Sequence, residues 1–224
     1  MYIDPTNEIV KLCVKGIEAE AAGDSEYARQ LSQEAWDKAS NDFEAFIAAH
    51  YLARHQNPEG ALKWNMEALI LATGMKDDNI RSHLPSLYLN VARSFEELKD
   101  PAGAVGYYNL GADNCVHLPP GPYGEMIKSG IQEGLKRCGA SRFANPALER
   151  LIDRWCGRKE LRPLAMVLPA YFGNLGTLQE RNKLISALSR LAASRQLPAD
   201  EQDELNGIIR SLAKDVMVSD HASA

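Results

Sequence analysis

Apolar residues recur at steps of three and four positions along most of this chain, a spacing typical of helices that bury one face. Residues 7–22 show the pattern, with Ile9, Leu12, Cys13 and Ile17 on one side. Gly, Asp, Asn or Pro residues separate one such stretch from the next, and the alternation typical of strands is nearly absent. The pattern therefore predicts an all-α protein. The first six predicted helices lie at about residues 7–22, 25–39, 41–55, 58–74, 85–98 and 101–111.

Small residues recur at a fixed spacing in the second, fourth and sixth of these stretches. In each stretch two small residues lie seven positions apart. The pairs are Ala28 and Ala35, Ala61 and Ala68, and Ala104 and Gly111. The first member recurs after 33 and then after 43 residues, which indicates stacked helical hairpins whose helices approach closely. The longer second interval falls at Met75–His83, which is either a helix extension or an inserted loop.

A break in the helical pattern ends this part of the chain. Residues 117–122 contain three prolines and a glycine, a combination that helices do not cross. A seventh helix is predicted at about residues 123–137, where a stacked array needs a terminal helix to shield its last hairpin. We therefore predict a first domain at residues 1–140, with three hairpins and a capping helix. Residues 141–224 form a second domain, either a small helical bundle or an extension of the array.

The second domain begins with an amphipathic helix that opens at Pro146. Leu151 and Trp155 share its apolar stripe, which is typical of a core. Its basic residues step by four along the opposite face, and they are Arg150, Arg154 and Arg158. This basic face binds phosphate or an acidic partner, docks onto the acidic first domain, or is simply solvated.

The rest of the second domain is short of motifs. Residues 161–172 form a short apolar segment that is either a buried helix or a strand. Two more helices are predicted, one after the capping box at Thr177–Glu180 and one after Pro198.

Three helix–turn–helix units with small residues at fixed positions resemble the tetratricopeptide repeat family over about residues 7–138. The first two units lack the aromatic residues of the family pattern, and its unit-ending proline is absent throughout. The resemblance implies an antiparallel helical-hairpin solenoid that binds other proteins, with related helical-hairpin solenoids as the alternative. Besides the small residues given above, the residues that match the family are Gly16, Ala49 and Ala92, with Tyr88 and Phe95 as aromatics in the third unit.

Charge is unevenly distributed along the chain, whose formal net charge is −5. Residues 1–140 contain 13 Lys and Arg against 20 Asp and Glu. This acidic balance argues against nucleic acid as the main ligand of the first domain and permits a cationic partner. Ordinary solvated faces are the alternative explanation.

The sequence also bears on the compartment. No apolar run approaches the roughly 20 residues that span a bilayer, and the N-terminus lacks the basic start and apolar core of a signal peptide. The four cysteines form no CxxC pair, which is typical of reduced cysteines. We therefore expect a cytoplasmic protein without a membrane partner.

Motifs of common active sites do not occur in the sequence, which has no P-loop, no HExxH and no GxSxG. His50 and His55 lie five residues apart, a poor spacing for two ligands on one helix face. Cys115 and His117 lack the second pair of ligands that a zinc site needs. We therefore expect a protein that is not an enzyme, without catalytic residues, metal or cofactor.

A binding surface is implied by the resemblance, because the first helix of each hairpin lines the concave side of such arrays. Phe43 and Phe46 are either apolar anchors for a ligand or part of the packing between hairpins. Arg54 and Arg93 either bind a carboxylate or form local ion pairs. A carboxylate clamp is only half matched, since Val14 and Ile47 stand where polar groups are expected. The candidate partner-binding residues are Glu20, Phe43, Phe46, His50, Arg54, Leu89, Asn90, Arg93 and Glu97.

These patterns favour a non-catalytic scaffold that binds a protein or peptide on its concave face. One alternative is an immunity-type or inhibitory protein that binds a single cognate toxin or enzyme. A second alternative is an enzyme that acts through the C-terminal region. The sequence names neither the partner nor the oligomeric state.

Overall fold

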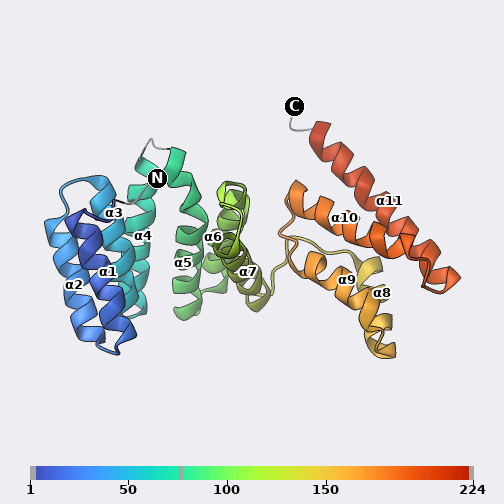
Figure 1. Ribbon diagram of the computed structural model, residues 1–224, viewed down its shortest axis with the longest axis horizontal. Coiled ribbons are helices and arrows are strands. Elements are labelled where there is room, and N and C mark those ends of the chain that lie inside the picture. The colour runs from blue at the N-terminus through green and yellow to red at the C-terminus, as the bar shows by residue number, and fades with distance from the viewer. Residues whose placement is uncertain (1–3, 76–77, 222–224) are drawn as a thin grey trace. The chain divides into compact units, whose positions relative to one another are not determined.

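The computed structural model describes residues 4–75 and 78–221, and every regular element in these ranges is a helix (Figure 1). The prediction of an all-α protein is therefore confirmed. The chain divides into two compact units, Met1–Ala140 and Ser141–Ala224, here called the N-terminal and the C-terminal unit.

The N-terminal unit has helices at each of the predicted stretches, with ends within a few residues of those expected. The segment at Met75–His83 contains a short 3-10 helix, and its residues 76–77 lie outside the described residues. The α-helices are α1 (Glu8–Ala21), α2 (Ser25–Lys38), α3 (Asp42–Leu52), α4 (Pro58–Gly74), α5 (Leu84–Glu97), α6 (Pro101–Asn114) and α7 (Pro122–Arg137). The 3-10 helices are η1 (Ala53–His55), η2 (Asp78–Ser82) and η3 (Cys115–His117).

Side-chain caps explain where several of these helices begin. The side-chain oxygen of Asn41 accepts the backbone N–H of Glu44 at 3.0 Å. Asn57 and Asp100 do the same for the first turns of α4 and α6, where a proline occupies the first helical position. These caps satisfy N–H groups that have no partner inside the helix. The helices therefore begin at the Asn and Asp residues from which the sequence predicted their starts.

Small residues lie at the contacts between these helices. Each α-helix from α1 to α6 contacts the next along the chain, and α1 also contacts α3. Ala28 and Ala104 have no exposed surface, and Ala61 is 9% exposed. A Cβ added to Gly16 of α1 would lie 3.5 Å from the backbone oxygen of Ala28 in α2. The prediction that the small residues are buried where helices meet is therefore confirmed.

A buried tyrosine joins α5, α6 and α7. Tyr108 of α6 has no exposed surface, and its hydroxyl donates to the carboxylate of Glu96 on α5. Arg137 of α7 donates to both oxygens of the same carboxylate, at 3.0 and 2.8 Å. These hydrogen bonds from Arg137, and then that from Tyr108, lower the pKa of Glu96 although burial raises it. A Cβ at Gly134 would lie 2.0 Å from Tyr108 Cζ, so only glycine lets α7 pack here.

The C-terminal unit consists of four helices around its own core. Residues 161–172, left open as helix or strand, are helical. Contacts run from α8 to α9, α9 to α10 and α10 to α11, and α11 also contacts α8. The core includes Leu148, Leu151, Leu184 and Leu205, which have no exposed surface. The helices are α8 (Pro146–Arg158), α9 (Leu161–Phe172), α10 (Leu178–Ala193) and α11 (Ala199–His221).

The basic face of α8 binds acidic residues inside its own unit. Trp155 is fully buried, as its place on the apolar stripe predicted, and its indole N–H donates to Glu201 of α11 at 3.0 Å. Arg158 donates to both oxygens of Glu201 at 2.8 and 2.9 Å, and Arg154 contacts Glu201 and Glu204. Two of the three arginines considered for an external phosphate or partner are therefore engaged with α11.

We expect Gly134→Ala to destabilise the N-terminal unit by about 1–3 kcal/mol, because Tyr108 is fully buried and cannot retreat from the added Cβ. Urea denaturation followed by circular dichroism measures the change. Gly106→Ala on α6 is the matched control, since a Cβ there meets no atom within 4 Å. Alanine favours a helix over glycine by about 0.8–1 kcal/mol, so the control should be more stable. Equal effects of the two substitutions would contradict the close contact.

We expect Glu201→Ala to destabilise the C-terminal unit by about 3 kcal/mol, because it leaves the buried indole N–H and two guanidinium groups without their acceptor. Glu204→Ala removes only a contact with Arg154 and should cost less than about 1 kcal/mol. The indole N–H signal of Trp155, followed by NMR during urea denaturation, reports on this unit, whereas Trp36 and Trp64 report on the N-terminal unit. Similar losses in the two variants would show that Glu201 does not organise the core.

Candidate functional site

An apolar pocket of about 320 Å³ opens in the N-terminal unit between α1, α3, α5 and the start of α7. Its walls are aliphatic and aromatic, with two histidines and one serine among them. Val14 of α1 and Tyr123 of α7 both line it, so these two helices face each other across the pocket. The lining residues are Val10, Cys13, Val14, Phe46, Ile47, His50, Tyr51, His83, Ser86, Leu87 and Tyr123.

A second, polar pocket of about 270 Å³ adjoins the first and shares His50 with it. The end of α3, helix η1 and parts of α4 and α5 form its walls. Asn65 of α4 donates to Ser94 of α5 at 3.0 Å, and this buried bond ties the two helices together beneath the pocket. The lining residues are His50, Ala53, Arg54, Gln56, Ala61, Asn65, Asn90, Arg93, Ser94 and Glu97.

Helical spacing explains why the two pockets form one surface. The residues of α5 that line them step by three or four positions, so they share one face of the helix. On α3 and η1 the same spacing runs from Phe46 through His50 to Arg54. We call this joint surface of the two pockets the α3–α5 face. It changes from apolar to polar along the helices, with His50 at the boundary.

His50 is half-buried, and its ring Nδ1 is buried without a hydrogen-bond partner among the described residues. Burial, followed by the positive charge of Arg54, lowers the pKa of His50 to about 4. The ring is therefore neutral near pH 7. A buried nitrogen that makes no hydrogen bond is costly in a folded protein.

The charged residues of the polar pocket differ in their partners. Arg54 donates to both carboxylate oxygens of Glu20 at 2.9 to 3.1 Å, so its charge is compensated within the unit. Arg93 and Glu97 are exposed and make no ion pair with any residue that the structure describes. An incoming anion therefore finds Arg93 rather than Arg54 available.

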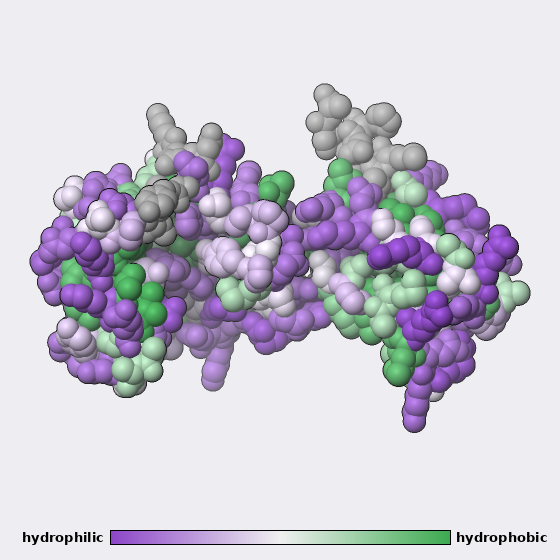
Figure 2. Space-filling view, in the orientation of Figure 1, coloured by the Kyte–Doolittle hydropathy of each residue, from purple (hydrophilic) through white to green (hydrophobic). Residues whose placement is uncertain are grey.

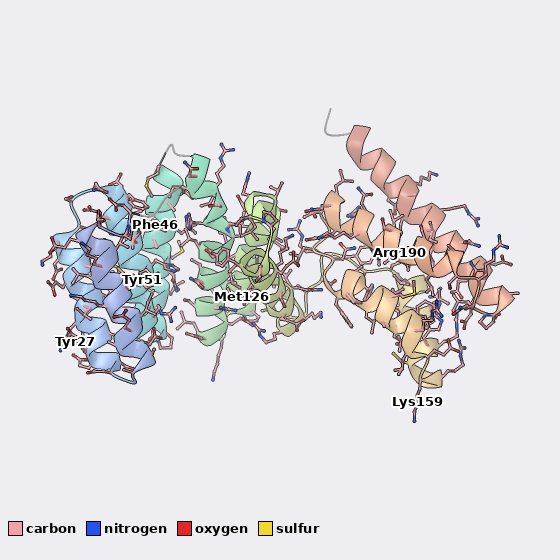
Figure 3. All side chains as sticks on the ribbon, in the orientation of Figure 1. Tyr27, Phe46, Tyr51, Met126, Lys159 and Arg190 are labelled. Atoms are coloured by element: carbon pink, nitrogen blue, oxygen red, sulfur yellow. The ribbon has the colours of Figure 1, made fainter. Side chains whose placement is uncertain are left out.

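Exposed apolar side chains continue the apolar pocket onto the surface. Val14 and Ile17 of α1 are exposed, and so are Tyr123 and Met126 of α7. We call these four residues the apolar rim. Figure 2 shows apolar surface beside α1 in the N-terminal unit, and Figure 3 marks Phe46 and Tyr51 on α3 and Met126 on α7. Val14 and Tyr123 line the pocket itself, and exposed apolar side chains beside a pocket are common at sites of interaction.

The structure brings together most of the residues that the sequence singled out. Phe46 and His50 line the apolar pocket, and His50, Arg54, Asn90, Arg93 and Glu97 line the polar one. Phe46 is only 5% exposed, so it is a wall of the pocket rather than a projecting anchor.

Three candidates lie outside the pockets. Glu20 lines neither pocket and is connected to the site by its hydrogen bonds with Arg54. Phe43 packs beside Phe46, with ring centroids 6.3 Å apart, and lines neither pocket. Leu89 is 2% exposed, because α7 covers it: a Cβ on Gly130 would lie 3.0 Å from Leu89 Cδ2. The expectation that Leu89 faces a ligand is therefore wrong for this arrangement of helices.

Several site residues were not anticipated from the sequence. His83 and Ser86 share the face of α5 that carries Asn90 and Arg93, and the three- and four-residue spacing was a usable signal for them. Tyr123 had no such signal, because its place depends on how α7 packs against the earlier helices.

The described parts of the chain contain no group of three or more His, Cys, Asp or Glu residues that could hold a metal ion. Nor does any helix described here have the length and apolar character needed to cross a membrane. Cys13 is buried in the wall of the apolar pocket, and this burial raises the pKa of its thiol to about 12, so the thiol is protonated.

Comparison of the chain with protein families, curated proteins and solved structures found no match. The geometry of the two pockets is therefore the basis for inferring what this surface does.

We expect the unfolding free energy to fall as pH decreases from about 6.5 to about 4, with a contribution from His50. In this range the unfolded His50 takes up a proton, whereas the folded ring stays neutral because burial lowers its pKa. Titration of the histidine ring signals by NMR should place the folded pKa of His50 near 4. In His50→Phe the pH dependence should be weaker than in the native chain. A His50 that titrates near 6.5 would contradict the burial of its ring.

Proposed function

We propose that the N-terminal unit is a tetratricopeptide-like array and that its function is the non-catalytic binding of a protein or peptide. In this proposal α1–α2, α3–α4 and α5–α6 are three stacked hairpins and α7 is the capping helix. The concave side is then the α3–α5 face together with the apolar rim. The buried small residues at the helix contacts support the stacked arrangement.

The observation that carries the proposal is the pair of adjoining pockets with opposite chemistry on one face. An apolar pocket beside a polar one suits a polypeptide segment, which presents apolar side chains next to polar backbone and charged groups. A binding role also accounts for the exposed apolar rim and for the charges of Arg93 and Glu97, which form no ion pair with the residues that the structure describes. The four free cysteines agree with action in a reducing compartment such as the cytoplasm.

We expect Arg93→Gln to weaken peptide binding by about ten-fold, since a hydrogen bond to a charged group is worth about 1.5–3 kcal/mol. The measurement starts from a random peptide library selected for binding to the full chain. The enriched peptides are then titrated against the native chain and its variants.

Arg29→Gln is the matched control, because Arg29 lies on α2, pairs with Glu26 at 2.7 Å and lines neither pocket. It removes the same charge and should leave affinity unchanged. Peptides that bind both variants as well as the native chain would place the binding site away from the α3–α5 face.

A further inference from the structure

We propose that the apolar pocket receives a tyrosine side chain of the partner segment, whose hydroxyl hydrogen-bonds to Nδ1 of His50, and that a carboxylate beside this tyrosine pairs with Arg93. This inference rests on the proposed function and names the chemistry that the site recognises. It makes one tyrosine next to an acidic group the central element of the bound segment.

The walls of the pocket favour an aromatic ring. Phe46, Tyr51 and Tyr123 contribute rings to a pocket of about 320 Å³, within the range of sites that enclose a small ligand. Aromatic rings gain from edge-to-face and offset contacts with one another in addition to burying apolar area. The ring of His50 already makes an edge contact with Tyr51, with centroids 5.3 Å apart, so a further ring would extend an existing cluster.

His50 favours a hydroxyl on that ring. Its Nδ1 is buried and has no hydrogen-bond partner among the residues described, and its ring lines both pockets, so the proposed bond includes a turn of the ring that brings Nδ1 to the pocket wall. A neutral imidazole nitrogen is a donor in one tautomer and an acceptor in the other. A phenol hydroxyl both donates and accepts, so it satisfies either tautomer. A phenylalanine ring would fill the same space and leave the nitrogen without a partner.

Arg93 favours a carboxylate close to the tyrosine. It lies beyond His50 on the α3–α5 face and forms no ion pair within the described ranges of the chain, whereas Arg54 is held by Glu20. Asn90 lies one turn before Arg93 and offers amide N–H donors to the same anion, while Glu97 lies one turn after it and repels one. The carboxylate is therefore expected on the His50 side of Arg93, near the tyrosine ring.

The apolar rim favours a polypeptide over a free aromatic acid. Val14 lines the pocket and is exposed, Ile17 is exposed on α1 one turn after Val14, and Met126 is exposed on α7 one turn after Tyr123. A single small molecule inside the pocket would leave these side chains in water. Residues that flank the tyrosine in a segment can cover them, which adds apolar burial.

Three small probes separate the contributions of the hydroxyl and the carboxylate. They are N-acetyl-L-tyrosine, N-acetyl-L-phenylalanine and N-acetyl-L-tyrosinamide, each titrated at millimolar concentration into the 15N-labelled full chain. Shifts should appear at the backbone amides of Phe46, His50 and Ser86. Loss of the hydroxyl or of the carboxylate should each weaken binding by about five- to ten-fold, as expected for one hydrogen bond that is partly offset by solvation.

Variants assign each difference to its residue. In His50→Phe the preference for the tyrosine probe over the phenylalanine probe should disappear, and in Arg93→Gln the preference for the acid over the amide should disappear. Arg29→Gln should keep both preferences. The comparison of the three probes on the native chain does not depend on any variant. Because Arg93 is exposed, Arg93→Gln is expected to fold. The test therefore decides the proposal even if His50→Phe folds poorly.

The proposal is overturned if no pocket amide shifts, if the three probes bind the native chain equally, or if a preference persists in the variant meant to remove it. Selected peptides that depend on Arg93 while N-acetyl-L-tyrosine fails to bind would leave the proposed function standing and remove only this inference. Binding of the probes without any selected peptide would overturn the polypeptide occupant and assign the pocket to a free aromatic acid.

Discussion

The N-terminal unit depends on the close approach of helices at positions where side chains are small. Ala28 and Ala104 are fully buried between helices, and at Gly16 a Cβ would already be in van der Waals contact with the backbone of α2. At the other end of the unit, Gly134 leaves room for the ring of Tyr108, whose hydroxyl is held by Glu96. Because protein interiors are packed nearly as densely as organic crystals, these contacts determine the positions of α3, α5 and α7. The two pockets are the space that remains between helices so placed.

Within that space, the distribution of hydrogen-bond partners distinguishes structural residues from available ones. Glu96 accepts from Tyr108 and Arg137, and Arg54 is engaged by Glu20, so these groups stabilise the fold. Arg93 and the Nδ1 of His50 have no such partners in the described part of the chain. The Nδ1 of His50 is buried, so leaving it without a partner costs stability, whereas the exposed Arg93 is hydrated until an anion binds.

The C-terminal unit uses the same residue types differently. The arginines at four-residue intervals on α8 resemble a surface for an acidic ligand, yet Arg154 and Arg158 bind Glu201 and Glu204 of α11. Burial raises the pKa of Glu201, but hydrogen bonds from Arg158 and Trp155 outweigh it and lower the pKa overall. The basic residues of this unit thus help to close its core, and a charge pattern alone did not distinguish this role from binding.

Much of the local structure was determined by the sequence itself. The three- and four-residue spacing predicted the helices, cap residues such as Asn57 and Asp100 marked where they begin, and the repeated alanines predicted buried contacts. These features depend on neighbours within a few positions, so a single chain displays them. The same spacing placed Asn90 and Arg93 on one face.

Only the tertiary structure decided which faces are covered and which residues from distant segments meet. Leu89 shares a helix with Arg93 but is buried by α7, Tyr123 completes a pocket begun by α1 and α3, and Trp155 finds its acceptor on α11. Contacts of this kind join residues separated by tens of positions. They depend on how whole helices pack against one another, and the spacing of apolar residues along a single helix does not predict this packing.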